Sequence, residues 1–148
     1  MSGKEHVAGR ATTFDKAEVM EEHIHALSMV YPSLAGGVTI TGGVAAWQEG
    51  AFAEIIPVDT ITEDFDIHFI VVEDVSLDDI YELSLYAATT EIGRIRLTAT
   101  LTAGGRIIFP PIPFQCRVQA KNAQIQAKLA NELGGSETVK ISLHYHEY

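Results

Sequence analysis

The sequence predicts an all-β domain, an antiparallel β-sandwich of the jelly-roll type, preceded by an N-terminal arm and one helix. Several segments alternate apolar and polar residues with period two, which is the pattern of strands that pack on a core from one side. Turn residues rich in glycine and proline separate these segments at intervals of about 8–12 residues, as in sandwiches and barrels. The length of 148 residues and the proline-marked crossovers favour a jelly roll.

The N-terminal part, residues 1–35, is expected to be separate from the sandwich of residues 36–148. Residues 1–13 are small, polar and charged, and predict a flexible arm. The next segment predicts a helix, because Asp15 can cap it and Glu18 follows three residues later, as in a capping box. Its apolar residues recur at helical spacing up to Pro32, which ends the run: Met20, Ile24, Leu27 and Tyr31.

Alternation is clearest in four segments of the sandwich, residues 94–102, 114–121, 123–129 and 139–146. In the last of these we expect the core-facing side chains to be Val139, Ile141, Leu143 and Tyr145. Further strands are predicted at 38–41, 44–48, 51–56, 65–73 and 80–87, which makes about eight or nine strands, the number that a sandwich or barrel uses.

Composition restricts the class of protein. Apolar residues make up 47% of the chain, so a hydrophobic core is expected. The net charge of −10 argues against nucleic acid and anionic membranes as partners, because phosphate contacts depend on Lys and Arg. The single cysteine excludes a disulfide within this sequence. The polar start MSGKEHVAGRATTF predicts no signal peptide, and the lack of an apolar run of 18 residues predicts no membrane span. We expect a protein that folds in a cytoplasm.

The chain ends in LHYHEY, in which His144 and His146 share one face of a predicted strand. Such a pair can bind a metal ion, but a zinc or iron site needs at least one more protein ligand. Glu147 is expected on the opposite face, and we expect no further strand to supply the missing ligand. The solvated face of a strand is therefore the favoured interpretation of the pair.

Three other histidines, His23, His25 and His68, are candidate metal ligands. His23 and His25 cannot share an ion on a helix, because positions i and i+2 diverge by about 200°. His68 lies in the predicted strand 65–73, on the face of Asp66 and opposite Phe65, Ile67 and Phe69. It could act as a ligand only if the fold brought it to the face of His144 and His146.

No residue pattern predicts catalysis. Cys116 falls on the apolar side of its predicted strand, where a free cysteine behaves as a small hydrophobe. Nucleophile-elbow, phosphate-loop and dinucleotide-binding patterns are absent from the sequence. The acidic pairs Glu63-Asp64, Glu73-Asp74 and Asp78-Asp79 are expected to solvate strand ends. We therefore expect a non-enzyme without catalytic residues, cofactor or metal.

A sugar-binding face is an open alternative. The predicted wet strand faces carry Arg94, Arg96, Arg117 and Lys128, and Trp47 could serve as an aromatic platform. A polar strand face is, however, the normal state of any such fold, and a single tryptophan is weak support.

Three stretches resemble a widespread group of tailed-bacteriophage proteins that look like virion structural components. They are GGVAAWQEGAFAEIIPVDTITEDFDIHFIVVEDV, YELSLYAATTEIGRIRLT and NAQIQAKLANELGGSETVKISLHYHEY, and the similarity covers about residues 36–148. The most characteristic parts are EIIP, YELSLY and the closing YHEY, none of which is a catalytic signature.

The resemblance implies a capsid cement (decoration) protein. Such proteins attach to the outside of an assembled head, often as homotrimers, and brace the major capsid protein. On this interpretation the protein is made in the host cytoplasm and resides on the virion surface, and residues 1–35 contact capsid or sister subunits. The alternatives are a tail, neck or fibre-associated protein, a glycan-binding sandwich, and a metal-dependent enzyme of the cupin type.

Overall fold

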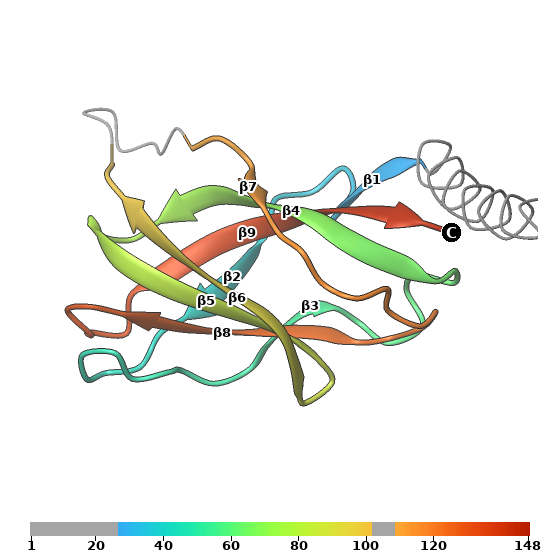
Figure 1. Ribbon diagram of the computed structural model, residues 1–148. Coiled ribbons are helices and arrows are strands. Elements are labelled where there is room, and N and C mark those ends of the chain that lie inside the picture. Colours follow the sequence, from blue (N-terminus) through green and yellow to red (C-terminus); the bar gives the residue numbers. More distant parts are fainter. Residues whose placement is uncertain (1–26, 102–108) are drawn as a thin grey trace, which may run out of the picture.

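The structure is a computed structural model that describes residues 27–101 and 109–148. These residues form nine strands in two antiparallel sheets, and none of them lies in a helix (Figure 1). A helix long and apolar enough to cross a membrane is accordingly not found in this part of the chain.

The first sheet has five strands and is organised around the last strand of the chain. β1 (Ser28–Tyr31) and β2 (Val38–Thr41) both pair with β9 (Thr138–Glu147). The sheet continues from β9 to β4 (Phe65–Val75) and then to the short β7 (Ile112–Pro113). β9 is therefore flanked on both sides, and the C-terminal residues belong to the interior of the sheet rather than to its edge.

The second sheet has four strands in the order β3 (Ala53–Ile56), β8 (Ile125–Asn131), β5 (Asp79–Ala87) and β6 (Thr90–Ala99). Apolar side chains from both sheets form a single buried cluster. The arrangement is therefore sandwich-like, as the alternation of apolar and polar residues predicts.

The alternation predicted for residues 123–129 and 139–146 is confirmed in β8 and β9. Ile125, Ala127 and Leu129 are buried on β8, and the four residues Val139, Ile141, Leu143 and Tyr145 are buried on β9. The largest fully buried side chain is Tyr81 of β5, whose hydroxyl donates a hydrogen bond to the carbonyl of Leu77 at 2.6 Å.

Two β-bulges change which side chains of β4 face the core. The register with β9 shifts between Ile67 and Phe69 and again between Val72 and Asp74. A bulge inserts one extra residue, so the inward and outward positions exchange. Strict alternation groups Phe69 with Phe65 and Ile67, but after the bulge Ile70 is buried instead and Phe69 is 38% exposed.

The predicted helix is wrong at its C-terminal end. Residues 28–31 form β1, because their backbone groups pair with β9 from Ser28↔His146 to Tyr31↔Leu143. This edge pairing outweighs the helical spacing of Leu27 and Tyr31, since propensity yields to tertiary contacts. The sheet thus begins before the expected boundary at residue 36. The rest of the predicted helix, and the arm of residues 1–13, lie outside the described residues.

Two predicted strands are also wrong. Residues 44–48 form a tight turn in which Gly43 N–H donates to the carbonyl of Gln48 at 2.9 Å, so the turn closes on itself. Residues 114–121 alternate only as far as Cys116; Val118 is exposed and Gln119 is buried. The segment meets β4 through a single bridge, Phe65↔Gln119, after the two-residue β7. The strand predicted at 38–41 coincides with β2, and the other predicted strands correspond to strands of the structure with shifted ends.

Candidate functional site

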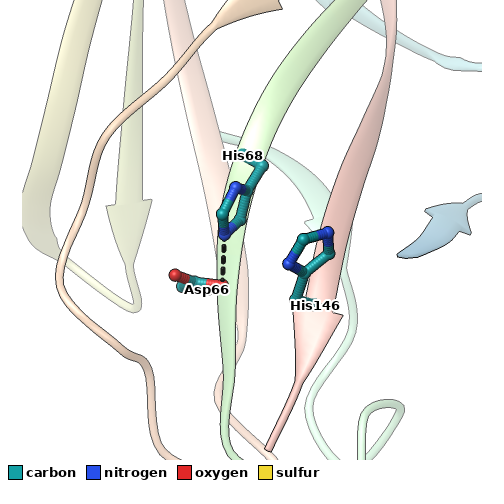
Figure 2. A group of neighbouring side chains, drawn as sticks. All are labelled: Asp66, His68 and His146. Carbon is teal, nitrogen blue, oxygen red and sulfur yellow. Dashed lines mark ion pairs between the residues drawn. The ribbon is translucent and has the colours of Figure 1, made fainter. Parts of the chain in front are cut away.

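Three side chains with potential metal-ligand atoms lie close together where β4 pairs with β9. Asp66 is paired with His146 in the antiparallel register, and His68 lies at the first β-bulge of β4. Asp66 and His68 point to the same face, and His146 joins them from the neighbouring strand (Figure 2). Asp66, His68 and His146 are called the histidine–aspartate cluster below.

The cluster is close enough for its members to act on one ligand. His68 Nε2 lies 2.9 Å from Asp66 Oδ1, and the His68 and His146 rings stack with centroids 4.0 Å apart and planes inclined by 27°. One potential ligand atom from each of the three residues lies within 4.8 Å of the others. The side chains of His68 and Asp66 are 23% and 15% exposed, so the cluster is accessible but largely desolvated.

The C-terminal residue holds the carboxylate of the cluster in place. Tyr148 Oη donates a hydrogen bond to Asp66 Oδ2 at 2.9 Å, which leaves Oδ1 to His68. Tyr148 N–H donates to the carbonyl of Asp64 at 2.9 Å, so the end of the chain is fixed at this point. Burial, together with the hydrogen bond to Asp66, raises the pKa of Tyr148 to about 12, so its hydroxyl remains a donor at neutral pH.

A hollow of about 410 Å³ opens beside the cluster. Its walls include Asp66 and His68 on one side and Pro113, Gln115 and Cys116 on the other. Burial raises the pKa of the Cys116 thiol, and the Asp66 carboxylate raises it further. A raised pKa favours the thiol over the nucleophilic thiolate, so Cys116 lines the hollow as a neutral group.

The predicted pair His144 and His146 does not act as a unit. His144 packs edge-to-face on Phe69 with ring centroids 6.3 Å apart, whereas His146 stacks on His68. His68 was expected to act as a ligand only if it met the face of His144 and His146, and it does meet His146.

The cluster depends on the antiparallel pairing of segments 65–73 and 139–146, and predicting that pairing would have revealed it. His23 and His25 lie outside the described residues.

A second polar surface covers the outer face of the second sheet. Arg94 forms ion pairs with Glu82, Glu91 and Glu49, and Arg96 Nη2 lies 2.6 Å from Glu82 Oε2. Hydrogen bonds from Arg96 and Arg94 hold the pKa of Glu82 below its ordinary value. Arg94 and Arg96 are therefore both paired with carboxylates of the same protein.

The aromatic side chains of this surface are covered by cations. The Arg96 guanidinium lies 4.5 Å from the centre of the Trp47 ring, and Lys128 Nζ lies 4.3 Å from the centre of the Phe52 ring. Arg117 lies elsewhere, between β7 and β8. Because Arg96 occupies one face of Trp47, the stacking platform that a sugar would need is partly blocked, which weakens the glycan-binding alternative.

Two loops lie at the end of the molecule opposite the C-terminus (Figure 1). Both loops expose apolar side chains. Val44 and Trp47 lie between β2 and β3, and Leu133 lies between β8 and β9; they are 75%, 41% and 66% exposed. The loops are joined by hydrogen bonds from Trp47 N–H to Asn131 O and from Gly135 N–H to Val44 O, both 2.8 Å long. Val44, Trp47 and Leu133 are called the apolar loop pair below.

Comparison of the chain with protein-family models, with curated proteins and with solved structures gives no match.

Proposed function

We propose that the fold is a jelly roll. In this fold an eight-stranded antiparallel hairpin is wound into two sheets, so the first strand pairs with the last, the second with the second last, and so on inwards. The pairings β2–β9, β3–β8, β4–β7 and β5–β6 follow this nested order, and β1 adds a further strand to β9. The pairing order supports the fold independently of the sequence pattern.

We further propose that the protein is a non-enzymatic virion structural protein, a capsid cement protein that binds and stabilises the assembled head. The resemblance of residues 36–148 to tailed-phage virion components supports this function, and jelly rolls are used in viral capsid domains. Fold alone does not determine function, so the proposal depends on a surface. The single observation that carries it is the apolar loop pair.

The apolar loop pair has the properties of a binding surface. Three large apolar side chains are presented to solvent on loops that are locked to each other, so little conformational entropy is lost when a partner covers them. Tryptophan is enriched among the residues that contribute most to interface affinity. A cement protein needs such a surface, because it stabilises a shell by adding the same buried contact at many positions.

The described part of the N-terminal segment adds a second exposed apolar region. Leu27, Val30 and Leu34 flank or belong to β1 and are exposed. In the proposed function this segment contacts the major capsid protein or a sister subunit. We propose a homotrimer on the outer capsid surface, and sedimentation equilibrium of the purified protein would measure its oligomeric state in solution.

A binding experiment with matched variants tests the proposed function. Heads that lack the protein are mixed with wild-type protein or with Val44→Asp, which places a charge in the apolar loop pair. The control is Val58→Asp, because Val58 is also an exposed valine (60%) but lies in the loop between β3 and β4. Wild type and Val58→Asp should co-sediment with heads and raise their resistance to heat, and Val44→Asp should bind at least about tenfold more weakly.

Absence of binding by the wild-type protein would overturn the cement function. Equal binding by all three proteins would leave the function standing but move the contact away from the apolar loop pair. Binding to tails or necks instead of heads would establish the alternative of a tail-associated protein.

A further inference from the structure

We propose that Asp66, His68 and His146 bind one divalent transition-metal ion, with Zn²⁺ the best fit among such ions. The proposal goes beyond the cement function and does not depend on it. Two imidazoles and one carboxylate are a common protein ligand set for such ions, which leaves one or more positions for water. The three side chains come from two paired strands, so an ion would cross-link β4 to the C-terminal end of β9.

The distances suit one ion after small side-chain rotations. In a tetrahedral zinc site neighbouring ligand atoms are about 3.4 Å apart. His68 Nε2 and Asp66 Oδ1 are 2.9 Å apart, and all three potential ligand atoms lie within 4.8 Å of one another. The nearly parallel stacking of the two rings has to open, because the nitrogen lone pairs of both rings must converge on the ion. Loss of this ring stacking is therefore an expected consequence of metal binding.

The surroundings of Asp66 have the form of an outer coordination shell. Carboxylate ligands in metal sites are usually held by hydrogen bonds from residues that do not touch the ion. Tyr148 Oη donates to Asp66 Oδ2 and leaves Oδ1 on the side of His68. The β-bulge at His68 is the second local feature, because bulges commonly redirect a side chain at a binding site.

The hollow beside the cluster reaches Asp66 and His68, two of the three proposed ligand residues, and offers room for a water ligand. It measures about 410 Å³ and is bounded by Asp66 and His68. A hard cation such as Ca²⁺ or Mg²⁺ fits poorly, because these ions prefer oxygen ligands and the cluster offers a single carboxylate. Imidazole ligands suit zinc, nickel, copper and iron.

The test is a titration of tag-free protein comprising residues 1–148, stripped with a chelator and then dialysed. Zn²⁺ is titrated by calorimetry, and Co²⁺ absorption reports the coordination number. The ligand variants are His146→Ala and Asp66→Asn. The matched control is His144→Ala, which removes the neighbouring histidine of the same strand that packs on Phe69 outside the cluster.

The wild type and His144→Ala should each bind one equivalent of Zn²⁺ with the same affinity. His146→Ala and Asp66→Asn should bind at least about tenfold more weakly, and Tyr148→Phe should lose roughly 10- to 100-fold in affinity through the outer shell. Wild-type protein that binds no stoichiometric metal, or ligand variants that bind as tightly as wild type, would overturn the proposal.

A second measurement decides the matter where a variant does not fold. Circular dichroism in the presence of chelator identifies the variants that do not fold. For these, the comparison of variants is replaced by nitrogen NMR spectra of the histidine rings in the wild-type protein. Zn²⁺ should shift the ring signals of His68 and His146 and leave those of His144 in place. A shift of the His144 signals alone, or of none of the three, would contradict the assignment.

Discussion

The sandwich arrangement makes a sharp prediction at Gly93, a residue of β6. An alanine Cβ at this position would lie 2.7 Å from Phe114 Cε2, and closer still to Cζ. Carbon atoms in favourable contact are about 3.5–4.0 Å apart, so the ring has to move by about 1 Å. Phe114 is 5% exposed, so its ring is packed against the core on the side of β6. We expect Gly93→Ala to lower the free energy of unfolding by about 1–3 kcal/mol, the usual cost of overpacking.

The measurement is urea unfolding followed by circular dichroism, with linear extrapolation to water. Gly36→Ala is the control, because the nearest atom to its added Cβ is Lys140 Nζ at 3.9 Å; its effect should stay within about 0.5 kcal/mol. In a double-mutant cycle with Phe114→Leu, the two changes should couple by roughly 0.5–3 kcal/mol. If Gly93→Ala were as stable as Gly36→Ala and showed no coupling to Phe114→Leu, the close packing of the Phe114 ring on Gly93 of β6 would be refuted.

Three further predictions concern the polar groups around the loops and the second sheet. Asn131→Ala should cost about 1–3 kcal/mol in urea unfolding, because the fully buried Asn131 Nδ2 donates to Asp79 Oδ2 at 2.8 Å and to Gly134 O at 2.7 Å. Burial raises the pKa of Asp79, but the hydrogen bonds from Asn131, Leu133 and Ile80 outweigh burial and hold the pKa below its ordinary value of 3.8. The ionised Asp79 carboxylate therefore stabilises the fold above pH 3.8, and this stabilisation is lost as the pH falls through the folded-state pKa. Asp79→Asn should therefore flatten the acid limb of a plot of stability against pH, and an unchanged limb would count against the network. Arg96→Ala should cost no more than about 1 kcal/mol, because the ion pair of the 60% exposed Arg96 is screened by water, and a larger loss of unfolding free energy would contradict this estimate.

Much of the fold could be predicted from local pattern. The last strand is the clearest case, because Val139, Ile141 and Leu143 alternate with polar residues and all three are buried as expected. The pattern failed where the chain makes a local irregularity. Val44 and Trp47 read as part of a strand because they are apolar, yet they lie in a turn and face solvent.

Edge pairing and bulges account for the other differences. Residues 28–31 form a strand because β9 offers them backbone partners, a fact that their own sequence does not contain. Phe69 faces outward because a bulge shifts the alternation by one residue. Such shifts depend on how two strands are aligned with each other. The alternation of apolar and polar residues within one segment does not show that alignment.

The histidine–aspartate cluster was only partly predictable. The sequence places His68 on the face of Asp66 and His146 on a polar face, but it does not show that the two faces adjoin. The pairing of Asp66 with His146 joins segments that are 80 positions apart in the chain. The favoured interpretation of His146 as part of a solvated strand face left out this non-local contact, and the expectation of no metal site remains open to the titration described above.

The most direct test of the proposed cement function is a cryo-electron microscopy comparison of virions made with and without this protein. The function predicts density at regularly repeated positions on the outer capsid surface, present only in virions that contain the protein, with Val44, Trp47 and Leu133 against the shell. Density confined to the tail or neck, or identical shells in both samples, would contradict it.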